Sequence, residues 1–397
     1  MAPALAFMTR KVSIITICVT VILFGQLSVF PGSGQFYRLS SQEETVINIG
    51  SDGIVHWNTA STIPFLIEKC DDLTKQDWAP YVRGIGHGTE NSIKIEHFES
   101  VEGMVFIPGG RFTMGDVLGD TRTARPVHTA EVNGFLMKRH EVTNREFRDV
   151  FQWAYDQGLV TVTNGEIVSV ESGAGLFGLE EFAVEISFAD GSFSVDQGKE
   201  NNPVIFVSWY GSAAYCNFLG MIEGKEICYD LINWTCDFSK RGYRLPTEAE
   251  WECAARGGYE GMRFPWGDTN VITHSRANYR SSTNNVYDVS PTRDFHPDYA
   301  SQALRTSPVG AFAPNNYGLF DMAGNVWEWV WDWGARYSSA HQVNPTGPAA
   351  GTHKVFRGGS NYTTAERCAV ATRYTSTEPT KYGYDTGFRT VLVVSPF

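Results

Sequence analysis

The stretch NYGLFDMAGNVWEWVWDW, from Asn316 to Trp333, constrains the fold more than any other part of the chain. Side chains alternate between the two faces of a strand, so an extended segment here would line one face with indoles. Burying these side chains removes a large apolar area from water. The pattern therefore predicts a strand in a packed core rather than a ligand platform. The alternating tryptophans are Trp327, Trp329, Trp331 and Trp333.

Carboxylates interrupt this apolar stretch at Asp321 and Glu328. A buried carboxylate needs a compensating partner, such as a metal ion, an arginine or several backbone N–H groups. Arginine is well suited, because its planar fork can bind both carboxylate oxygens. We expect the later arginines Arg357 and Arg389 to pair with buried carboxylates, and the candidates are Asp321, Glu250 and Asp332.

The composition is that of a folded protein, with 42% hydrophobic and 19% charged residues. At 397 residues the chain has room for two or three domains. Its 39 glycines and 11 tryptophans indicate a loop-rich fold held together by aromatic clusters. A formal net charge of −12 argues against a nucleic-acid partner, because phosphate binding requires a basic surface.

The first 34 residues are typical of an export signal. Arg10 and Lys11 precede an apolar run of 13 residues from Val12 to Phe24, which is shorter than a typical membrane span. No clear A-x-A cleavage site follows, so the alternative to a cleaved signal is an uncleaved N-terminal anchor. Such an anchor is the only contact with a membrane that we expect. We therefore expect an exported protein, either secreted, periplasmic or on the cell surface.

An even number of cysteines after this segment permits disulfides, and the favoured bridge joins Cys228 to Cys236 across a hairpin.

Residues 35–100 are predicted to form a small all-β module. The runs TVINIG, GIVHW and PFLIEKC have strand composition and are separated by turn residues. The module is interpreted as a spacer or docking unit rather than a catalytic one. A second unit, residues 101–397, is predicted to begin with the strand-like GMVFIPGGRFTMGD.

Capping boxes predict two helices in this second unit. Thr143 with Glu146 predicts a helix from Asn144 to near Gly158, and Thr247 with Glu250 predicts one that ends near Arg256. Hairpin turns are expected at Asn164-Gly165 and Asp190-Gly191, within a β-rich insertion over 160–197.

The segment from Asn201 is predicted to form a short strand followed by a helix. The chain after Arg256 is predicted to be mostly loop. The expected inner face of the helix consists of Trp209, Ala213, Cys216 and Leu219.

Eight motifs resemble, in sequence and in order, the formylglycine-generating enzyme (sulfatase-modifying factor) family. The resemblance covers about Val101 to Phe397 and implies an irregular α+β fold related to C-type lectins, often stabilised by calcium. The motifs are FIPGGRFTMGD, PVHTAEVNGFLMKRHEVTNREF, NPVIFVSW, YRLPTEAEWE, FPWGD, SPVGAFAPNNYGLFDMAGNVWEW, FRGGS and GFR.

Active members of that family oxidise a cysteine within C-x-P-x-R of an unfolded sulfatase to formylglycine, using oxygen and copper(I) held by two thiolates. In the family the first of these cysteines lies three residues after RGGS, and the second lies five residues later. Here the positions are Thr363 and Cys368. Because soft thiolates select copper(I) and a hydroxyl cannot replace one, the resemblance does not imply copper binding here.

The match of Cys368 leaves an alternative open, since RCAVATR also resembles a later, structural cysteine of the family. Cys368 is then a buried or disulfide-bonded cysteine rather than a reactive one. Ser360 either lines a substrate pocket, by analogy with the family, or is a turn residue after two glycines.

The resemblance also implies calcium ligands. One site uses the side chains of Asp321 and Glu328 with the backbone carbonyls of Gly324 and Val326; the alternative is that the two carboxylates cap loop amides. A second site would start at Asn278 and the Tyr279 carbonyl. Its carboxylate is either Asp288 or Asp298.

Three functions therefore remain open for the second unit. The first is a non-catalytic domain that binds a peptide, protein or glycan. The second is a maturation enzyme that works without the copper pair, and the third is formylglycine generation by an oxidoreductase. Sequence motifs for other enzymes, such as H-E-x-x-H, G-x-S-x-G and the P-loop, are absent.

Overall fold

The computed structural model describes residues 101–119 and 121–393, together with the backbone of eight strands between residues 21 and 94. The chain divides into two compact units. The first comprises Met1–Pro80 with Ile85–Glu99, and the second comprises Tyr81–Gly84 with Ser100–Phe397. Of the expected export segment, only the first two strands lie among the described residues. No helix in the described residues is long and apolar enough to cross a membrane.

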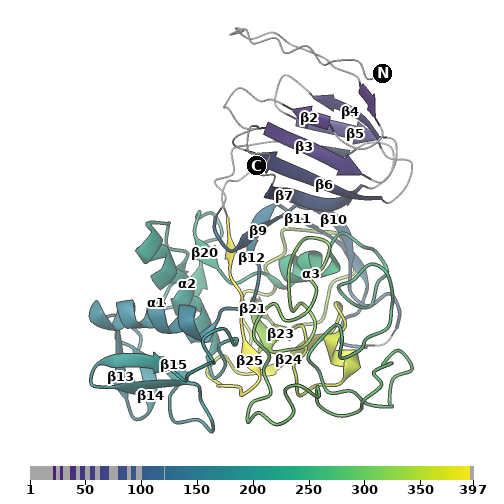
Figure 1. The fold of residues 1–397 in the computed structure, drawn as a ribbon. Helices are drawn as coiled ribbons and strands as arrows, with labels where there is room; N and C mark the ends of the chain where they lie inside the picture. The colour runs from purple at the N-terminus through teal and green to yellow at the C-terminus, as the bar shows by residue number, and fades with distance from the viewer. Residues whose placement is uncertain are drawn as a thin grey trace, which may run out of the picture. The chain divides into compact units, whose positions relative to one another are not determined.

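The N-terminal unit is built from two four-stranded sheets, drawn in purple in Figure 1. Strands occur at all three predicted positions, and each pairs with antiparallel neighbours. The first sheet has the order β1 (Val21–Leu23), β4 (Thr45–Ile49), β5 (Ile54–Asn58), β8 (Asn91–Lys94); the second has the order β2 (Leu27–Val29), β3 (Phe36–Ser41), β6 (Ile63–Cys70), β7 (Ala79–Gly86).

The second unit is a mixed α+β structure with little regular secondary structure, as predicted. Two four-stranded sheets lie at its centre. Their orders are β20 (Tyr243–Arg244), β26 (Val391–Leu392), β12 (Phe135–Lys138), β9 (Met104–Ile107), and β24 (Arg373–Thr377), β23 (Lys354–Arg357), β21 (Trp327–Trp333), β25 (Thr386–Gly387).

Smaller sheets and hairpins surround these two. They are β10 (Gly110–Met114), β11 (His128–Val132) and β22 (Gln342–Val343); β13 (Val160–Thr163), β14 (Glu166–Ser169) and β15 (Gly175–Gly178); β16 (Ile186–Ala189) with β17 (Ser192–Val195); and β18 (Tyr229–Asp230) with β19 (Thr235–Cys236). The relation of this fold to C-type lectins stays a prediction.

The tryptophan run forms strand β21, and both of its faces are buried. Trp329 lies 4.0 Å from Phe356 between ring centroids, and Phe356 is its cross-strand partner on β23. Two residues along β23, the Lys354 ammonium lies 3.8 Å from the Trp333 ring centroid. The indoles therefore follow one face of the sheet, as predicted. On the other face of the sheet Glu328 is fully buried, so β21 places a charged side chain inside the core.

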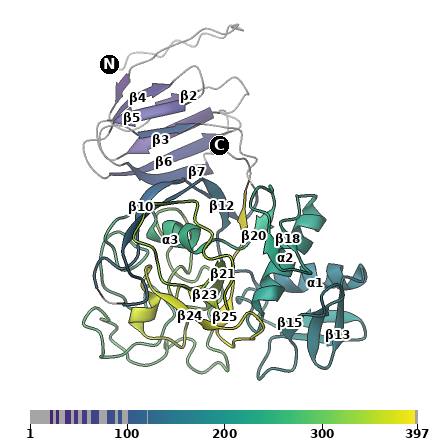
Figure 2. The ribbon, with the colours of Figure 1, turned by 180° about the vertical axis from the view of Figure 1, so that it is seen from behind.

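Both predicted capping boxes are confirmed. Helix α1 (Asn144–Asp156) starts at Thr143, which exchanges hydrogen bonds with Glu146, and helix α3 (Glu248–Arg256) starts at Thr247, which does the same with Glu250. Helix α3 lies against β10, β11, β21 and β23, and is seen below β10 in Figure 2. Its position brings three of its glutamates into the interior.

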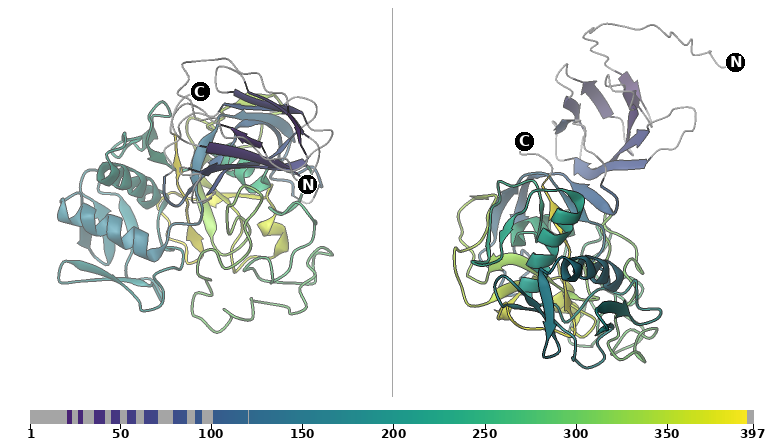
Figure 3. Two further views of the ribbon diagram at one scale, coloured as in Figure 1. Left: turned by 45° about the horizontal axis from the view of Figure 1, so that its top comes forward. Right: turned by 90° about the vertical axis from the view of Figure 1, so that its left-hand side faces the viewer.

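Both predicted hairpin turns are confirmed too. Asn164 and Gly165 join β13 to β14, and Asp190 and Gly191 join β16 to β17; all four residues have positive φ, as a type I′ turn requires. The insertion packs on helices α1 and α2 (Trp209–Glu223), which lie side by side in Figure 3.

The predicted strand before α2 is wrong. Residues 203–207 make only isolated bridges, at Pro203 and Val207, and Phe206 has a φ of 60°. That left-handed residue breaks the extended path. The predicted inner face of α2 is only partly right, because Leu219 is half-buried whereas Gly220 is buried.

The predicted disulfide between Cys228 and Cys236 is absent, and both side chains are free thiols. The hairpin itself forms, with Tyr229 opposite Cys236. Cys228 therefore lies opposite Asp237, whose N–H donates to its carbonyl at 2.8 Å. Neighbouring residues of a strand point to opposite faces, so the two thiols are not directed at each other.

The long stretch between α3 and β21 contains no helix or strand among its residues 257–326, as predicted. Buried side chains order it instead. Asp288 accepts hydrogen bonds from the Tyr279 hydroxyl at 2.6 Å, the Ser281 hydroxyl at 2.9 Å and the Ser282 N–H at 2.7 Å. This carboxylate holds the loop together with isolated backbone bridges, such as the one between Ile272 and Asp288.

Candidate functional site

The RGGS segment turns sharply after strand β23. Gly358 and Gly359 both have positive φ, of 92° and 76°. A Cβ at Gly359 would lie 2.9 Å from the backbone of Arg367 and 2.9 Å from the Cys368 sulfur. Only glycine lets the loop pass this close to the short 3₁₀ helix η1 (Ala365–Cys368). The glycines thus bring the residues after RGGS together with Cys368.

Thr363 and Cys368, the two positions that the resemblance matches with the family's copper-binding pair, are neighbours in space. Burial raises the pKa of the Cys368 thiol well above its ordinary value, and the Glu366 carboxylate raises it further. A hydrogen bond with the Thr363 hydroxyl opposes this shift without reversing it. Cys368 is fully buried and is a free thiol, so of the alternative interpretations the structure agrees with a buried cysteine and not with a disulfide-bonded one.

Ser360 is completely buried and bonded on several sides. Its hydroxyl donates to Asp385 Oδ2 at 2.6 Å, and its N–H donates to the Thr363 hydroxyl at 2.8 Å. Burial raises the pKa of Asp385, and the hydrogen bond from Ser360 opposes the shift. Ser360 therefore holds the turn and is joined to Asp385, a residue that the sequence reasoning missed although it lies only four residues before the GFR arginine.

Glu328, a predicted calcium ligand, has both carboxylate oxygens occupied by protein donors. Arg389 donates through Nε and Nη2, each at 2.7 Å, and Trp251 Nε1 donates at 2.8 Å. Both members of the ion pair are fully buried. The prediction that Arg389 pairs with a buried carboxylate is right, but the partner is Glu328 and not one of the three named candidates.

Asp321, the other predicted carboxylate ligand, has a hydrogen-bond donor at only one of its two carboxylate oxygens. Its Oδ2 accepts the Gly310 N–H at 2.6 Å, whereas Oδ1 is buried without a hydrogen-bond partner among the described residues. Among the described residues, both oxygens of the fully buried Glu141 likewise have no partner other than the Asp321 carboxyl group itself. Burial and the neighbouring Asp321 charge raise the pKa of Glu141, and burial raises that of Asp321 to about 6. Two carboxylates with three unbonded oxygens are suited to a cation.

Sequence reasoning missed Glu141 because it lies in the motif HEVTN, 180 residues before Asp321. The backbone carbonyls of Gly324 and Val326 belong to the same loop as Asp321. Within the part of the chain that the structure describes, no group of three or more His, Cys, Asp or Glu side chains is arranged to hold a metal ion. A cation here would therefore depend on two carboxylates and backbone carbonyls.

The predicted second site is occupied by internal hydrogen bonds. The Asn278 amide donates to the Arg305 carbonyl at 2.8 Å, and His274 Nε2 lies 3.1 Å from the Tyr279 carbonyl. Of the two candidate carboxylates, Asp288 is bound by the loop donors described above, and Asp298 is exposed. Among the described residues, no side-chain oxygen of Asn278, Asp288 or Asp298 is buried without a hydrogen-bond partner, and the second calcium site stays a prediction.

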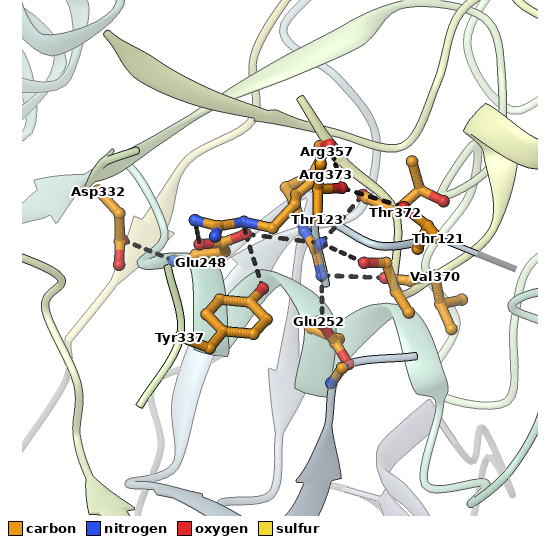
Figure 4. Close-up of polar contacts among 12 residues, drawn as sticks. Thr121, Thr123, Glu248, Glu252, Asp332, Tyr337, Arg357, Val370, Thr372 and Arg373 are labelled. Atoms are coloured by element: carbon orange, nitrogen blue, oxygen red, sulfur yellow. Dashed lines mark hydrogen bonds and ion pairs between the residues drawn. The ribbon is translucent and has the colours of Figure 1, made fainter. Parts of the chain in front are cut away.

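Arg357 of the RGGS motif also pairs with partners other than those predicted. It donates to Glu252 at 2.5 Å and lies 3.6 Å from Glu248, both on helix α3 (Figure 4). Arg373, beside it on β24, forms two hydrogen bonds with Glu248, at 2.7 and 2.6 Å. These buried pairs attach the RGGS strand to α3, so the motif's arginine is a structural residue.

Comparison with known proteins gives three results. The sulfatase-modifying factor enzyme 1-like domain matches residues 89–394. The formylglycine-generating enzyme of Thermomonospora curvata is 34% identical over 322 residues, which cover 73% of this chain and 93% of that protein. The inactive C-alpha-formylglycine-generating enzyme 2 of Bos taurus is 33% identical over 309 residues, which cover 72% and 86%.

Among solved structures, Treponema denticola variable protein 1 is similar with a TM-score of 0.51 and 25% sequence identity. The similarity covers 77% of this chain and 96% of that one.

Proposed function

The chain belongs to the sulfatase-modifying factor family, and we propose that it acts as a binding or maturation protein that lacks copper-dependent formylglycine generation. The observation that carries this proposal is the pair Thr363 and Cys368. Copper(I) is held in the family by two thiolates, and this chain offers one thiol beside one hydroxyl. A hydroxyl is a hard ligand that stays protonated at neutral pH.

The state of Cys368 supports the same proposal. A thiol binds a metal or attacks a substrate as the thiolate, and burial disfavours that charged form. The raised pKa of Cys368 therefore keeps the sulfur protonated, and its complete burial separates it from solvent. Neither property suits a catalytic cysteine.

Sequence identity alone does not decide the activity. The chain is 34% identical to a relative named as a formylglycine-generating enzyme and 33% identical to one named as inactive. Whether this chain is active therefore depends on the residues at the two cysteine positions. The alternative function is formylglycine generation, or another maturation reaction, on a sulfatase-derived peptide.

The test is incubation of the full chain with a C-x-P-x-R peptide, copper(I) and oxygen, followed by mass spectrometry of the peptide. The proposal predicts no aldehyde with the wild-type chain. A relative that carries both cysteines serves as the positive control. Aldehyde formed by the wild-type chain and lost in Cys368→Ser would overturn the proposal.

Calcium is proposed as a structural ligand between Asp321 and Glu141. The support is the three buried carboxylate oxygens without donors, which a divalent cation would satisfy together with the Gly324 and Val326 carbonyls. Glu328 would act beside the ion by holding Arg389. The chemistry supplied by calcium is charge neutralisation, which would fix the loop that leads into β21.

Export and the partner class are also proposed on sequence grounds. The basic and apolar N-terminal segment favours export, and the acidic net charge of −12 favours basic peptides or cations over nucleic acids. A peptide, protein or glycan is the class of partner that the loop-rich second unit would recognise. Binding of an array-immobilised glycan or peptide without turnover would support this role.

A further inference from the structure

A cavity of about 270 Å³ lies where the N-terminus of α3 meets the end of strand β21. None of Ser360, Thr363 and Cys368 lines it, so it is separate from the site described above. Figure 4 shows four of its residues, Glu248, Asp332, Tyr337 and Arg373, drawn together. The cavity has polar groups on one side and the apolar side chains of Met114 and Trp333 in its wall.

Most of the charge around the cavity is internally balanced. Glu248 accepts two hydrogen bonds from Arg373 and a third from the Tyr337 hydroxyl at 2.9 Å. The guanidinium of Arg373 also lies 4.2 Å from the Tyr337 ring centroid. The Glu248 carboxylate and the Arg373 guanidinium therefore neutralise each other within the cavity wall.

Asp332 is the exception. Its Oδ2 accepts the Glu248 N–H at 2.7 Å, and no group in residues 101–119 or 121–393 donates to Oδ1. The residue is 5% exposed and lines the cavity. A nearly buried carboxylate oxygen without a donor is costly unless a ligand or water supplies one.

Gly347 keeps this oxygen accessible. Its φ is +70°, and a Cβ built on it would lie 2.7 Å from Asp332 Oδ1. Any other side chain at position 347 would cover the oxygen and would also be strained. The Gly347 backbone therefore packs closely against the Asp332 carboxylate and leaves free the space that a side chain would fill beside Oδ1.

Neither of the two other basic side chains near the cavity donates to this oxygen. Lys354 donates through Nζ to the Trp331 carbonyl at 2.7 Å and lies 3.8 Å from the ring centroids of both Trp209 and Trp333. No ion pair links it to Asp332 among the described side chains. Arg336, which also lines the cavity, is exposed at its mouth, where solvent screens its charge.

We propose that this cavity binds a small molecule through a primary ammonium group, with one ammonium N–H donated to Asp332 Oδ1. An ammonium ion supplies both the missing donor and a positive charge, and the short apolar wall would receive its alkyl chain. A metal ion is a poorer occupant, because no three ligating side chains converge here in the described part of the chain. An anion is disfavoured, because the Asp332 carboxylate would repel it.

The test is a calorimetric titration of the full chain with n-butylammonium, tetramethylammonium and butyrate at pH 8. We expect saturable one-to-one binding of n-butylammonium in the roughly millimolar range, and at least about tenfold weaker binding of the two other probes. Tetramethylammonium is the critical comparison, because it has the charge but no N–H to donate.

Two variants locate the binding. Asp332→Asn should weaken n-butylammonium binding roughly tenfold or more, since it removes a charge-assisted hydrogen bond, whereas the exposed Asp196→Asn should leave it unchanged. If Asp332→Asn does not fold, Ser338→Trp at the exposed mouth should abolish binding by filling the cavity.

Three results would overturn the proposal. They are the absence of saturable binding to the wild-type chain, equal affinity for tetramethylammonium, and unchanged affinity in the folded Asp332→Asn variant or in Ser338→Trp.

Discussion

Arg389 and Glu328 form a fully buried, bidentate ion pair in which Arg389 Nε and Nη2 each lie 2.7 Å from a different oxygen of the Glu328 carboxylate. Arg389 also donates to the Phe320 carbonyl at 3.0 Å. The pair therefore joins the GFR motif to the tryptophan strand and to the loop before it. This contact explains why both motifs carry a charged residue inside an apolar core.

Breaking this pair should destabilise the chain strongly. In Arg389→Met the Glu328 charge would be left buried with only the Trp251 N–H as donor. The expected loss is about 3–5 kcal/mol, because an unpaired buried charge is far more costly than the pair is stabilising. Urea denaturation of the full chain measures it.

The control for that measurement is Arg111→Met, which breaks an exposed pair with Glu131. Solvent screens such a pair, so the free energy of unfolding from urea denaturation should stay within about 1 kcal/mol of the wild-type value. Equal destabilisation by the two substitutions would contradict the structural role assigned to Arg389.

Calcium should stabilise the chain through Glu141 and Asp321. We expect the melting temperature to rise with added calcium and to fall with a chelator, because a cation bound only to the folded state stabilises it by mass action. Glu141→Gln and Asp321→Asn should each remove most of this response. A wild-type melting temperature that is the same with calcium and with chelator would exclude the site.

The stability of the chain should depend on pH through Lys354. Burial lowers the pKa of Lys354 to about 7, while Asp332 and the surrounding indoles favour the charged form. Between about 7 and 10.5 the unfolded chain binds a proton that the folded chain lacks. Stability contributed by neutral Lys354 is therefore present at high pH and is lost as the pH falls through this window.

The measurement is urea denaturation at pH values between 7 and 10, with Lys354→Met as the comparison. The wild-type chain should gain stability as the pH rises, and the variant should show a smaller gain. A slope unchanged by the substitution would show that Lys354 is charged throughout this range.

Local sequence signals predicted the elements whose cause is local. The capping boxes at Thr143 and Thr247 and the turns at Asn164-Gly165 and Asp190-Gly191 satisfy their own backbone groups within a few residues, so their conformations could be read from the sequence. The alternation of tryptophans likewise predicted strand β21. In each case the residues that determine the structure lie next to one another in the chain.

Features that depend on distant contacts could not be predicted in the same way. Arg357 pairs with Glu252, 105 residues away, and Asp321 lies beside Glu141. The failed strand over 203–207 has the same origin, since Val204 and Phe206 donate to carbonyls of other segments and not to a neighbouring strand. Only the folded arrangement reveals these partners.

Restoring the second thiol should create a copper site. In Thr363→Cys a sulfur would replace the hydroxyl that contacts the Cys368 thiol, so two soft ligands would lie together. We expect this variant to bind copper(I) more tightly than the wild-type chain, and Thr364→Cys, one residue further along, to show a smaller gain. Competition with a colorimetric copper(I) chelator measures both affinities.

Copper occupancy of the purified wild-type chain tests the proposed absence of copper-dependent activity most directly. After incubation with copper(I) under reducing conditions and removal of unbound metal, mass spectrometry of the elements gives the copper content per chain. The pairing of Thr363 with Cys368 predicts a content far below one copper per chain, rising towards one in Thr363→Cys. A wild-type chain that retains close to one copper would contradict it.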